Sequence, residues 1–136
     1  MGALIKIVHN KKLLHIICKR KCKKKRSNIS TDDKFLQVAE LNLKKNDTFK
    51  PHMHIWKVPK STLVIAQESW IILEGKVKIS TYDTKGKFIK SFILNKGDYS
   101  ITYEGGHTYT ALTNNTRVLE YKTGPYEGIE RDKVFI

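Results

Sequence analysis

The stretch QESWIILEGKVKISTYDTKGKFIKSFIL, residues 67–94, decides the fold class. It contains three runs of alternating apolar, β-branched and aromatic residues, separated by the turn formers Glu74-Gly75 and Asp83 to Gly86. These runs span residues 67–73, 76–82 and 88–94. Short runs of this kind between glycine-marked turns are typical of antiparallel strands. We therefore predict a three-stranded antiparallel meander here.

The same rhythm continues on both sides of this stretch. Further strands are predicted at residues 35–43, 49–56, 99–103, 107–112 and 117–122, and no helix is predicted after residue 35. Many short strands at intervals of about 8–12 residues indicate a sandwich or a barrel. The predicted fold class is all-β, with an antiparallel barrel and C-terminal tail over residues 35–136.

Residues 1–34 are predicted to form an N-terminal β-hairpin and a basic linker. Two apolar runs within residues 3–17 flank a polar turn, so they indicate a hairpin, which we expect to attach to an edge of the barrel. Cys18 and Cys22 lie in a basic stretch that lowers thiol pKa values. We expect two exposed free thiols and a reducing compartment.

The composition fits one globular domain. The chain has 136 residues, of which 40% are hydrophobic, enough for one core. No apolar run approaches the about 20 residues that cross a bilayer, and the start lacks an apolar segment followed by a small-residue cleavage site. We expect a soluble, cytoplasmic protein with no membrane partner.

The formal net charge of +13 leaves two interpretations open. Seven of the cations lie in the single run Lys19–Arg26. This run has no interleaved aromatic residues that could stack on bases, so a solvated loop in a lysine-rich protein is the favoured interpretation. The alternative is a patch that binds phosphate groups or nucleic acid.

Three histidines in the β region indicate a metal site. His52 and His54 are separated by one residue, so on a strand they share a face with their Cα atoms about 7 Å apart. Metals that prefer nitrogen and oxygen need three or four such donors, and His107 with a carboxylate would complete the set. The alternative is that these histidines are hydrogen-bonded core residues.

The spacing of these residues resembles the two motifs of the cupin family. Pro51 to His54 supplies the His-x-His pair of the first motif, and Glu68 stands seven residues before a glycine, as that motif requires. His107 stands ten residues after the glycine that opens the second motif. The resemblance implies a jelly-roll (cupin) barrel and one divalent transition metal, Fe, Zn, Mn or Ni. The implied ligands are His52, His54, Glu68 and His107.

The match departs from the cupin motifs at three points. No glycine precedes His52 at the usual distance, thirteen residues separate His54 from Glu68, where the motif has three or four, and Tyr103 replaces a proline. The distance from glycine to histidine in the second motif is also one residue shorter. A polar loop over residues 57–62 accounts for the longer gap. Gln67, which points the opposite way on the same strand, is the rival to Glu68 as a donor.

The chain is also similar to small cupins found among polysaccharide-biosynthesis genes. The shared features are a strand that begins Gln67-Glu68, the loop Gly105-Gly106-His107 and the tail segment Lys122 to Tyr126. This resemblance implies a small-molecule ligand related to carbohydrates or sugar nucleotides. We therefore expect an isomerase or epimerase, with a metal-dependent oxygenase as the second possibility.

Candidate catalytic residues come from the strands that face the predicted site. Tyr109 shares a face with His107, while Glu120 and Lys122 share one face of the last strand and form either an acid–base pair or a surface salt bridge. Tyr99 and Tyr103 are expected to add hydroxyl groups at the mouth of the barrel.

Two further expectations concern accessibility and assembly. If Trp56 and Trp70 fill the barrel, no substrate reaches the ion and the protein is a non-catalytic binding module. Cupins commonly dimerise through sheet edges, so a homodimer is expected.

Overall fold

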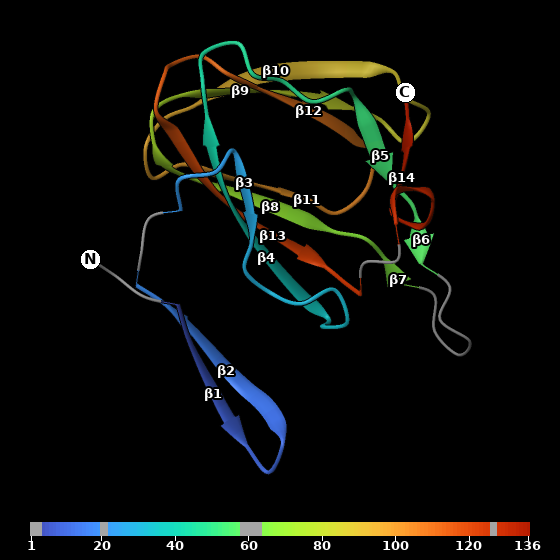
Figure 1. Cartoon of the computed structure of the whole chain (residues 1–136). Coiled ribbons are helices and arrows are strands. Elements are labelled where there is room, and N and C mark those ends of the chain that lie inside the picture. The colour runs from blue at the N-terminus through green and yellow to red at the C-terminus, as the bar shows by residue number, and fades with distance from the viewer. Residues whose placement is uncertain (1–3, 20–21, 58–63, 126–127) are drawn as a thin grey trace.

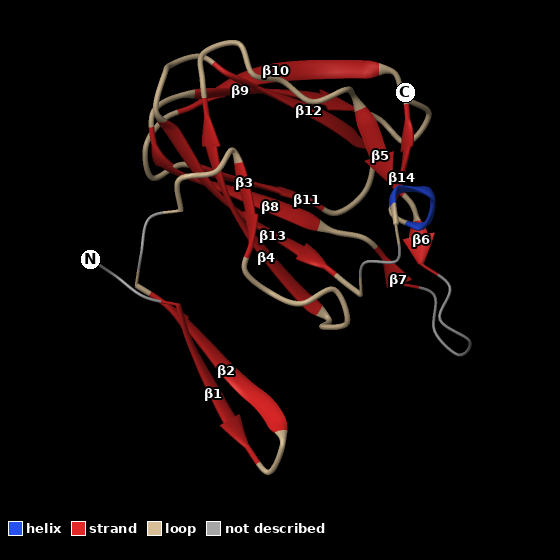
Figure 2. Ribbon diagram, in the orientation of Figure 1, coloured by secondary structure: helices blue, strands red, loops and turns tan. Residues whose placement is uncertain are grey.

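Two five-stranded antiparallel sheets face each other and form a barrel (Figures 1 and 2). The computed structural model describes residues 4–19, 22–57, 64–125 and 128–136. One sheet has the order β10 (Phe88–Leu94), β9 (Val77–Tyr82), β12 (Gly106–Ala111), β5 (His52–His54) and β14 (Lys133–Phe135). The other has the order β11 (Tyr99–Thr102), β8 (Glu68–Glu74), β13 (Thr116–Thr123), β4 (Leu36–Leu43) and β3 (Arg26–Asn28). The predicted all-β jelly roll is confirmed.

The chain passes repeatedly from one sheet to the other, which corrects the predicted meander. β9 and β10 pair as expected, but β8 pairs with β11 and β13 in the opposite sheet. The Glu74-Gly75 turn is therefore a corner between sheets, where Gly75 has φ 84° and an added Cβ would lie 2.5 Å from Thr116 Oγ1. A turn sequence marks where a strand ends, but it does not say which sheet the next strand joins.

The inner positions change from apolar to polar along the barrel. The hydrophobic core contains Leu41, Leu43, Trp70, Ile72, Val77, Ile79, Tyr109, Ala111 and Val118. Glu120 lies beside Trp70 in the paired strands, and Lys122 lies beside Glu68, one step further along the same face. Because inner residues repeat every second position, one end of the barrel is a packed core and the other carries polar side chains.

The N-terminal hairpin is confirmed, but its predicted attachment is wrong. β1 (Leu4–His9) pairs with β2 (Lys12–Cys18) in a sheet of its own, and among the described strands neither pairs with the barrel. In Figure 1 the hairpin projects beyond the barrel, and residues of β2 line a cavity together with residues of β4 and β13. Instead, β3 from the predicted basic linker occupies the edge of the barrel sheet, paired with β4.

One of the two thiols is buried. Cys18 is exposed, as expected, but Cys22 is buried, and its backbone N–H donates to Glu40 Oε1 at 3.3 Å. Burial raises the pKa of the Cys22 thiol, so the prediction of two exposed, activated thiols is wrong for this residue.

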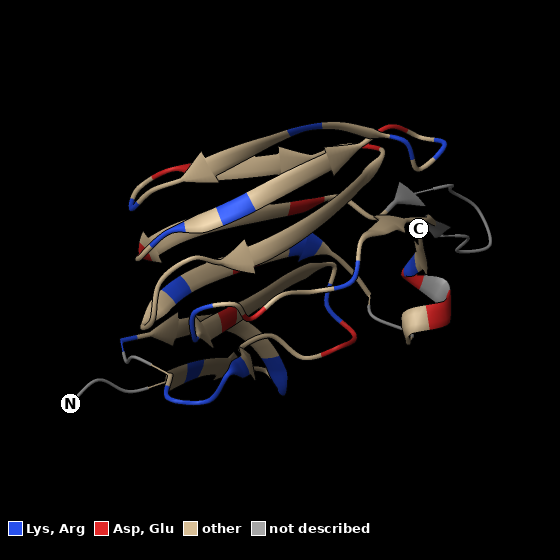
Figure 3. Ribbon diagram, turned by 90° about the horizontal axis from the view of Figure 1, so that it is seen from above, with Lys and Arg blue, Asp and Glu red and all other residues tan. Residues whose placement is uncertain are grey.

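Cationic residues are not confined to the basic run. Lys and Arg also occur on strands and loops of the barrel (Figure 3). Among the described residues, no helix is long and apolar enough to cross a membrane.

The C-terminal tail contributes two further elements to the polar end of the barrel. A single 3-10 turn, η1 (Ile129–Arg131), precedes β14, which pairs with β5. A small ribbon of β6 (Trp56–Lys57) and β7 (Val64–Ile65) lies nearby (Figure 1). The tail therefore forms the edge strand beside the strand that carries the His-x-His pair.

Candidate metal centre

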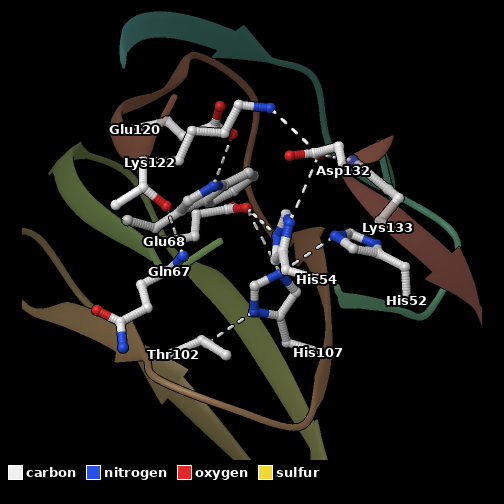
Figure 4. A network of polar contacts seen from close by, with 12 residues as sticks. His52, His54, Gln67, Glu68, Thr102, His107, Glu120, Lys122, Asp132 and Lys133 are labelled. Carbon is white, nitrogen blue, oxygen red and sulfur yellow. Dashed lines mark hydrogen bonds and ion pairs between the residues drawn. The ribbon is translucent and has the colours of Figure 1, made fainter. Parts of the chain in front are cut away.

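The structure brings the four predicted metal ligands together inside the barrel. His52 and His54 lie on β5, His107 on β12 and Glu68 on β8 of the facing sheet. All four are buried, and one donor atom from each lies within 4.8 Å of the others. Figure 4 shows their side chains converging on one place.

Strand register explains this convergence. His107 is paired directly with His52 across β12 and β5, so their side chains are neighbours on the inner face. Their Nε2 atoms are 3.2 Å apart. Glu68 approaches from the opposite sheet, with Oε2 2.6 Å from His54 Nε2 and 3.7 Å from His107 Nε2.

The outer ring nitrogen of each histidine has its own partner. His52 Nδ1–H donates to the Lys50 carbonyl oxygen at 2.7 Å, and His107 Nδ1 lies 2.7 Å from the Thr102 hydroxyl. His54 Nδ1 lies 3.5 Å from Asp132 Oδ2. Partners at Nδ1 fix the ring orientation and direct each Nε2 toward the centre, as in known metal sites.

The donor set fits a divalent transition metal. Two ligand atoms about 2.1 Å from a common ion lie about 3.0–3.4 Å apart, close to the 3.2 and 3.7 Å separations here. His54 Nε2 lies only 2.6 Å from Glu68 Oε2, an ion pair that a bound ion would replace.

Two carboxylates set the protonation of His54. Burial disfavours its charged form, but Asp132 and Glu68 together outweigh that effect and raise the pKa of His54 to about 9. Conversely, the neighbouring histidines lower the pKa of Glu68 despite its burial. Without an ion, His54 therefore carries a proton at neutral pH.

The other two histidines are neutral. Burial lowers the pKa of His52, and it lowers the pKa of His107 to about 4. Neutral imidazoles are the form that binds metals. At pH 7, two of the three histidines are thus already in the ligating state.

A cavity of about 310 Å³ adjoins the cluster. His52 and Glu68 lie on its wall, and so do Trp70 and Tyr109. Trp70 is buried, yet it does not close the cavity; the side chain of Trp56 lies outside the described residues.

The predicted catalytic residues line this same cavity, but not as the predicted pair. Glu120 accepts hydrogen bonds from Arg26 Nη2 at 2.6 Å and Trp70 Nε1 at 3.0 Å, while Lys122 Nζ lies 3.4 Å from Asp132 Oδ2. Glu120 and Lys122 are largely buried, so the surface salt bridge is wrong.

Of the remaining predicted residues, Tyr109 lines the cavity, whereas Tyr99, Tyr103 and Gln67 do not. Tyr109 is stacked on Trp70 at 3.9 Å and its hydroxyl lies 2.8 Å from the Ser100 hydroxyl. Burial raises the pKa of Tyr109, which keeps its proton. Tyr99 and Tyr103 are exposed and are not among the residues lining the cavity. Gln67 points away from the histidines (Figure 4).

Sequence reasoning missed several residues of the site. Asp132 and Lys133 come from the tail, and Arg26 comes from the basic run. The short alternation Lys133-Val134-Phe135 was the one local signal for a strand there. Thr102, which orients His107, is directly paired with Glu68 between β11 and β8.

This jelly roll, with a His-x-His pair, a glutamate and a third histidine inside, has the cupin fold. Comparison with solved structures supports this fold. Capsular polysaccharide assembling protein CapF from Staphylococcus aureus aligns with a TM-score of 0.64 at 16% identity, covering 98% of this chain and 32% of that one. KdgF from Halomonas sp. aligns at 0.56 and 14% identity, covering 75% and 79%.

A cupin superfamily protein from Desulfitobacterium hafniense aligns at a TM-score of 0.53 and 12% identity, covering 73% of this chain and 75% of that one. No protein-family model and no curated protein sequence matches the chain. At these identities the comparisons establish the fold, and the chain spans only about a third of CapF.

Proposed function

We propose that this protein is a metal-binding cupin whose ion is held by His52, His54, Glu68 and His107. The observation that carries the proposal is the arrangement of the three imidazoles. Each Nδ1 faces a partner outside the cluster, and each Nε2 faces the buried centre beside a carboxylate. This donor set suits Fe, Zn, Mn or Ni.

A titration with Co²⁺ tests this assignment. Protein treated with a chelator should develop the visible absorption bands of a coordinated ion and saturate at about one ion per chain. His52→Ala should prevent this, while His15→Ala, at an exposed position in the hairpin, should not. Equal spectra for the two variants would contradict the assignment.

We propose further that the site acts on a carbohydrate or sugar-nucleotide-like molecule, as an isomerase or epimerase. A divalent ion with open positions polarises a substrate oxygen when it is bound. The capsular polysaccharide role named for CapF supports this substrate class. Isomerisation also needs groups that move protons, and the cavity wall supplies them.

Three side chains of the cavity wall have candidate roles in the reaction. Glu120 is the candidate proton acceptor, held in place by Arg26 and Trp70. Tyr109 keeps its proton, because burial raises its pKa, and is a candidate hydrogen-bond donor to the substrate. Lys122 would stabilise negative charge on the substrate.

Turnover measurements separate the enzyme from a non-catalytic module. The cavity beside His52 and Glu68 supports access, so metal-loaded protein should convert a hexose or its nucleotide derivative in an NMR time course. Glu120→Gln should abolish conversion while keeping the ion. Binding without product over hours, by wild-type protein, would favour the module.

A further inference from the structure

We propose that the N-terminal hairpin, residues 4–18, docks on a second copy of the chain, against β11 and the outer face of the sheet beside it. Each copy would give its own hairpin and receive the hairpin of its partner, so the contact is reciprocal about a two-fold axis. This interface concerns assembly and does not depend on the bound ion.

The outer face of the β11-β8-β13-β4-β3 sheet is apolar, although the solvent side of an antiparallel sheet is commonly polar. Glu68, Trp70 and Ile72 of β8 are buried inside the barrel, so the residues that alternate with them point outward. The outward apolar residues of this sheet include Ile71 and Leu73 on β8, Leu119 and Tyr121 on β13, and Tyr99 and Ile101 on β11. The outward positions of β9 and β12 in the opposite sheet instead carry Lys78, Ser80, Thr108 and Thr110. A broad apolar face on one sheet alone indicates a contact surface.

The hairpin of the same chain covers only one half of this face. Leu13 and Ile16 of β2 line a cavity together with residues of β4 and β13. Tyr99 and Ile101 are not among the residues lining that cavity, and they are 64% and 51% exposed. Their strand, β11, is also the edge strand of the sheet and pairs with β8. The half of the face at β11 is therefore at the surface.

The hairpin carries a second apolar surface. Its two strands form a sheet of their own, and an isolated two-stranded ribbon is only marginally stable in water. Ile5 is paired with Ile17 across the ribbon, and Ile7 lies two residues further along the same face. These three side chains are 43–44% exposed and are not among the residues lining the cavity beside β2. Packing against another molecule would remove them from water.

Charge favours a second copy of this chain as the occupant. Residues 4–18 contain three lysines and no acidic residue. Residues 96–104, which include β11, contain Lys96, Asp98 and Glu104 and have a net charge of −1, in a chain whose net charge is +13. Opposite charges on the two segments offset the repulsion between two basic chains at the contact. Both complementary surfaces lie on one chain, as a reciprocal dimer requires.

The area of these surfaces matches what a stable dimer needs. The side chains concerned are 43–64% exposed and comprise Ile5, Ile7, Val8, Ile17, Tyr99, Ile101 and Tyr103. Covering them in both copies would bury roughly 600–1,200 Å² of apolar surface. Because apolar atoms form about two-thirds of a homodimer interface, the total would be roughly 900–1,800 Å². Stable interfaces bury about 1,200–2,000 Å².

Analytical ultracentrifugation of the full chain tests the inference. Wild-type protein should sediment with twice the 15.7 kDa mass of one chain. Ile7→Glu and Ile101→Glu, on opposite sides of the contact, should each raise the dimer Kd at least tenfold, because each places a charge in an apolar interface. Ile93→Glu introduces the same charge at a 57% exposed position on β10 and should leave the Kd unchanged. Wild-type protein that is monomeric at about 100 µM, or an equal effect of all three variants, would overturn the inference.

Photo-crosslinking identifies the surface that the hairpin contacts. A benzophenone amino acid would replace Val8, which is 59% exposed, in a mixture of ¹⁴N-labelled and ¹⁵N-labelled chains. We expect links between light and heavy chains that map to residues 99–103. Links within one chain, or between two hairpins, would overturn the inference. If one glutamate variant does not fold by circular dichroism, the other variant and the cross-link still decide the question.

Discussion

Metal affinity should rise steeply with pH, because the ion must displace one proton. The carboxylates of Asp132 and Glu68 overcome burial and raise the pKa of His54 to about 9, while His52 and His107 have lowered pKa values and are neutral. At pH 7 only about one metal-free molecule in a hundred has the His54 proton removed. This costs about 2.7 kcal/mol, or a hundredfold in Kd, relative to the limit above pH 9.

The sign and slope follow from this linkage. The metal-free state binds the proton below pH 9 and the metal-bound state does not, so affinity falls as pH falls. Zn²⁺ affinity measured by competition with a chelator at pH 6.5, 7.5 and 8.5 should increase about tenfold per unit. Asp132→Asn should flatten the slope by lowering the pKa of His54, and His15→Gln should not. An affinity independent of pH over this range would refute the reasoning.

Three further predictions concern the barrel. Arg117→Met should lower the free energy of unfolding in urea by about 3 kcal/mol, because Arg117 Nη2 lies 2.8 Å from Glu40 and its loss leaves that buried carboxylate without an ion-pair partner. A loss below about 1 kcal/mol would contradict this. Trp70→Phe should cost about 1–2 kcal/mol by removing the N–H donated to Glu120, and unchanged stability would show that the bond is dispensable. Gly105→Ala should cost about 1–3 kcal/mol, because φ is +86° and the new Cβ would lie 2.5 Å from a β9 carbonyl; a wild-type melting temperature would argue against that strain.

The local features of the fold were predictable because each depends on a two-residue period. Alternation along β4 predicts that Leu41 and Leu43 share a face, and both are buried in the core. The same period places His52 and His54 side by side. The cupin resemblance then supplied Glu68 and His107 as the residues meeting them from other strands, and the structure brings these together.

The features that the sequence did not reveal depend on contacts between distant segments. The turn at Gly75 joins two sheets, and nothing local distinguishes it from a hairpin turn. β14 has only three residues, so its alternation is too short to predict a strand by itself. Consequently Asp132, which faces His54, could not be placed at the site from sequence alone. Arg26 was hidden in a run of similar cations.

Elemental analysis of protein purified without chelators tests the central claim most directly. Wild-type protein should carry about one transition-metal ion per chain. His107→Ala should lose most of it, and Glu68→Gln less, because an amide oxygen can still coordinate but no longer offsets the charge. Removing the ion should also lower the melting temperature, by the equivalent of about 2.7 kcal/mol if free metal had been at a hundredfold excess over Kd. Wild-type protein without stoichiometric metal, or His107→Ala with a full complement, would contradict the four-residue site.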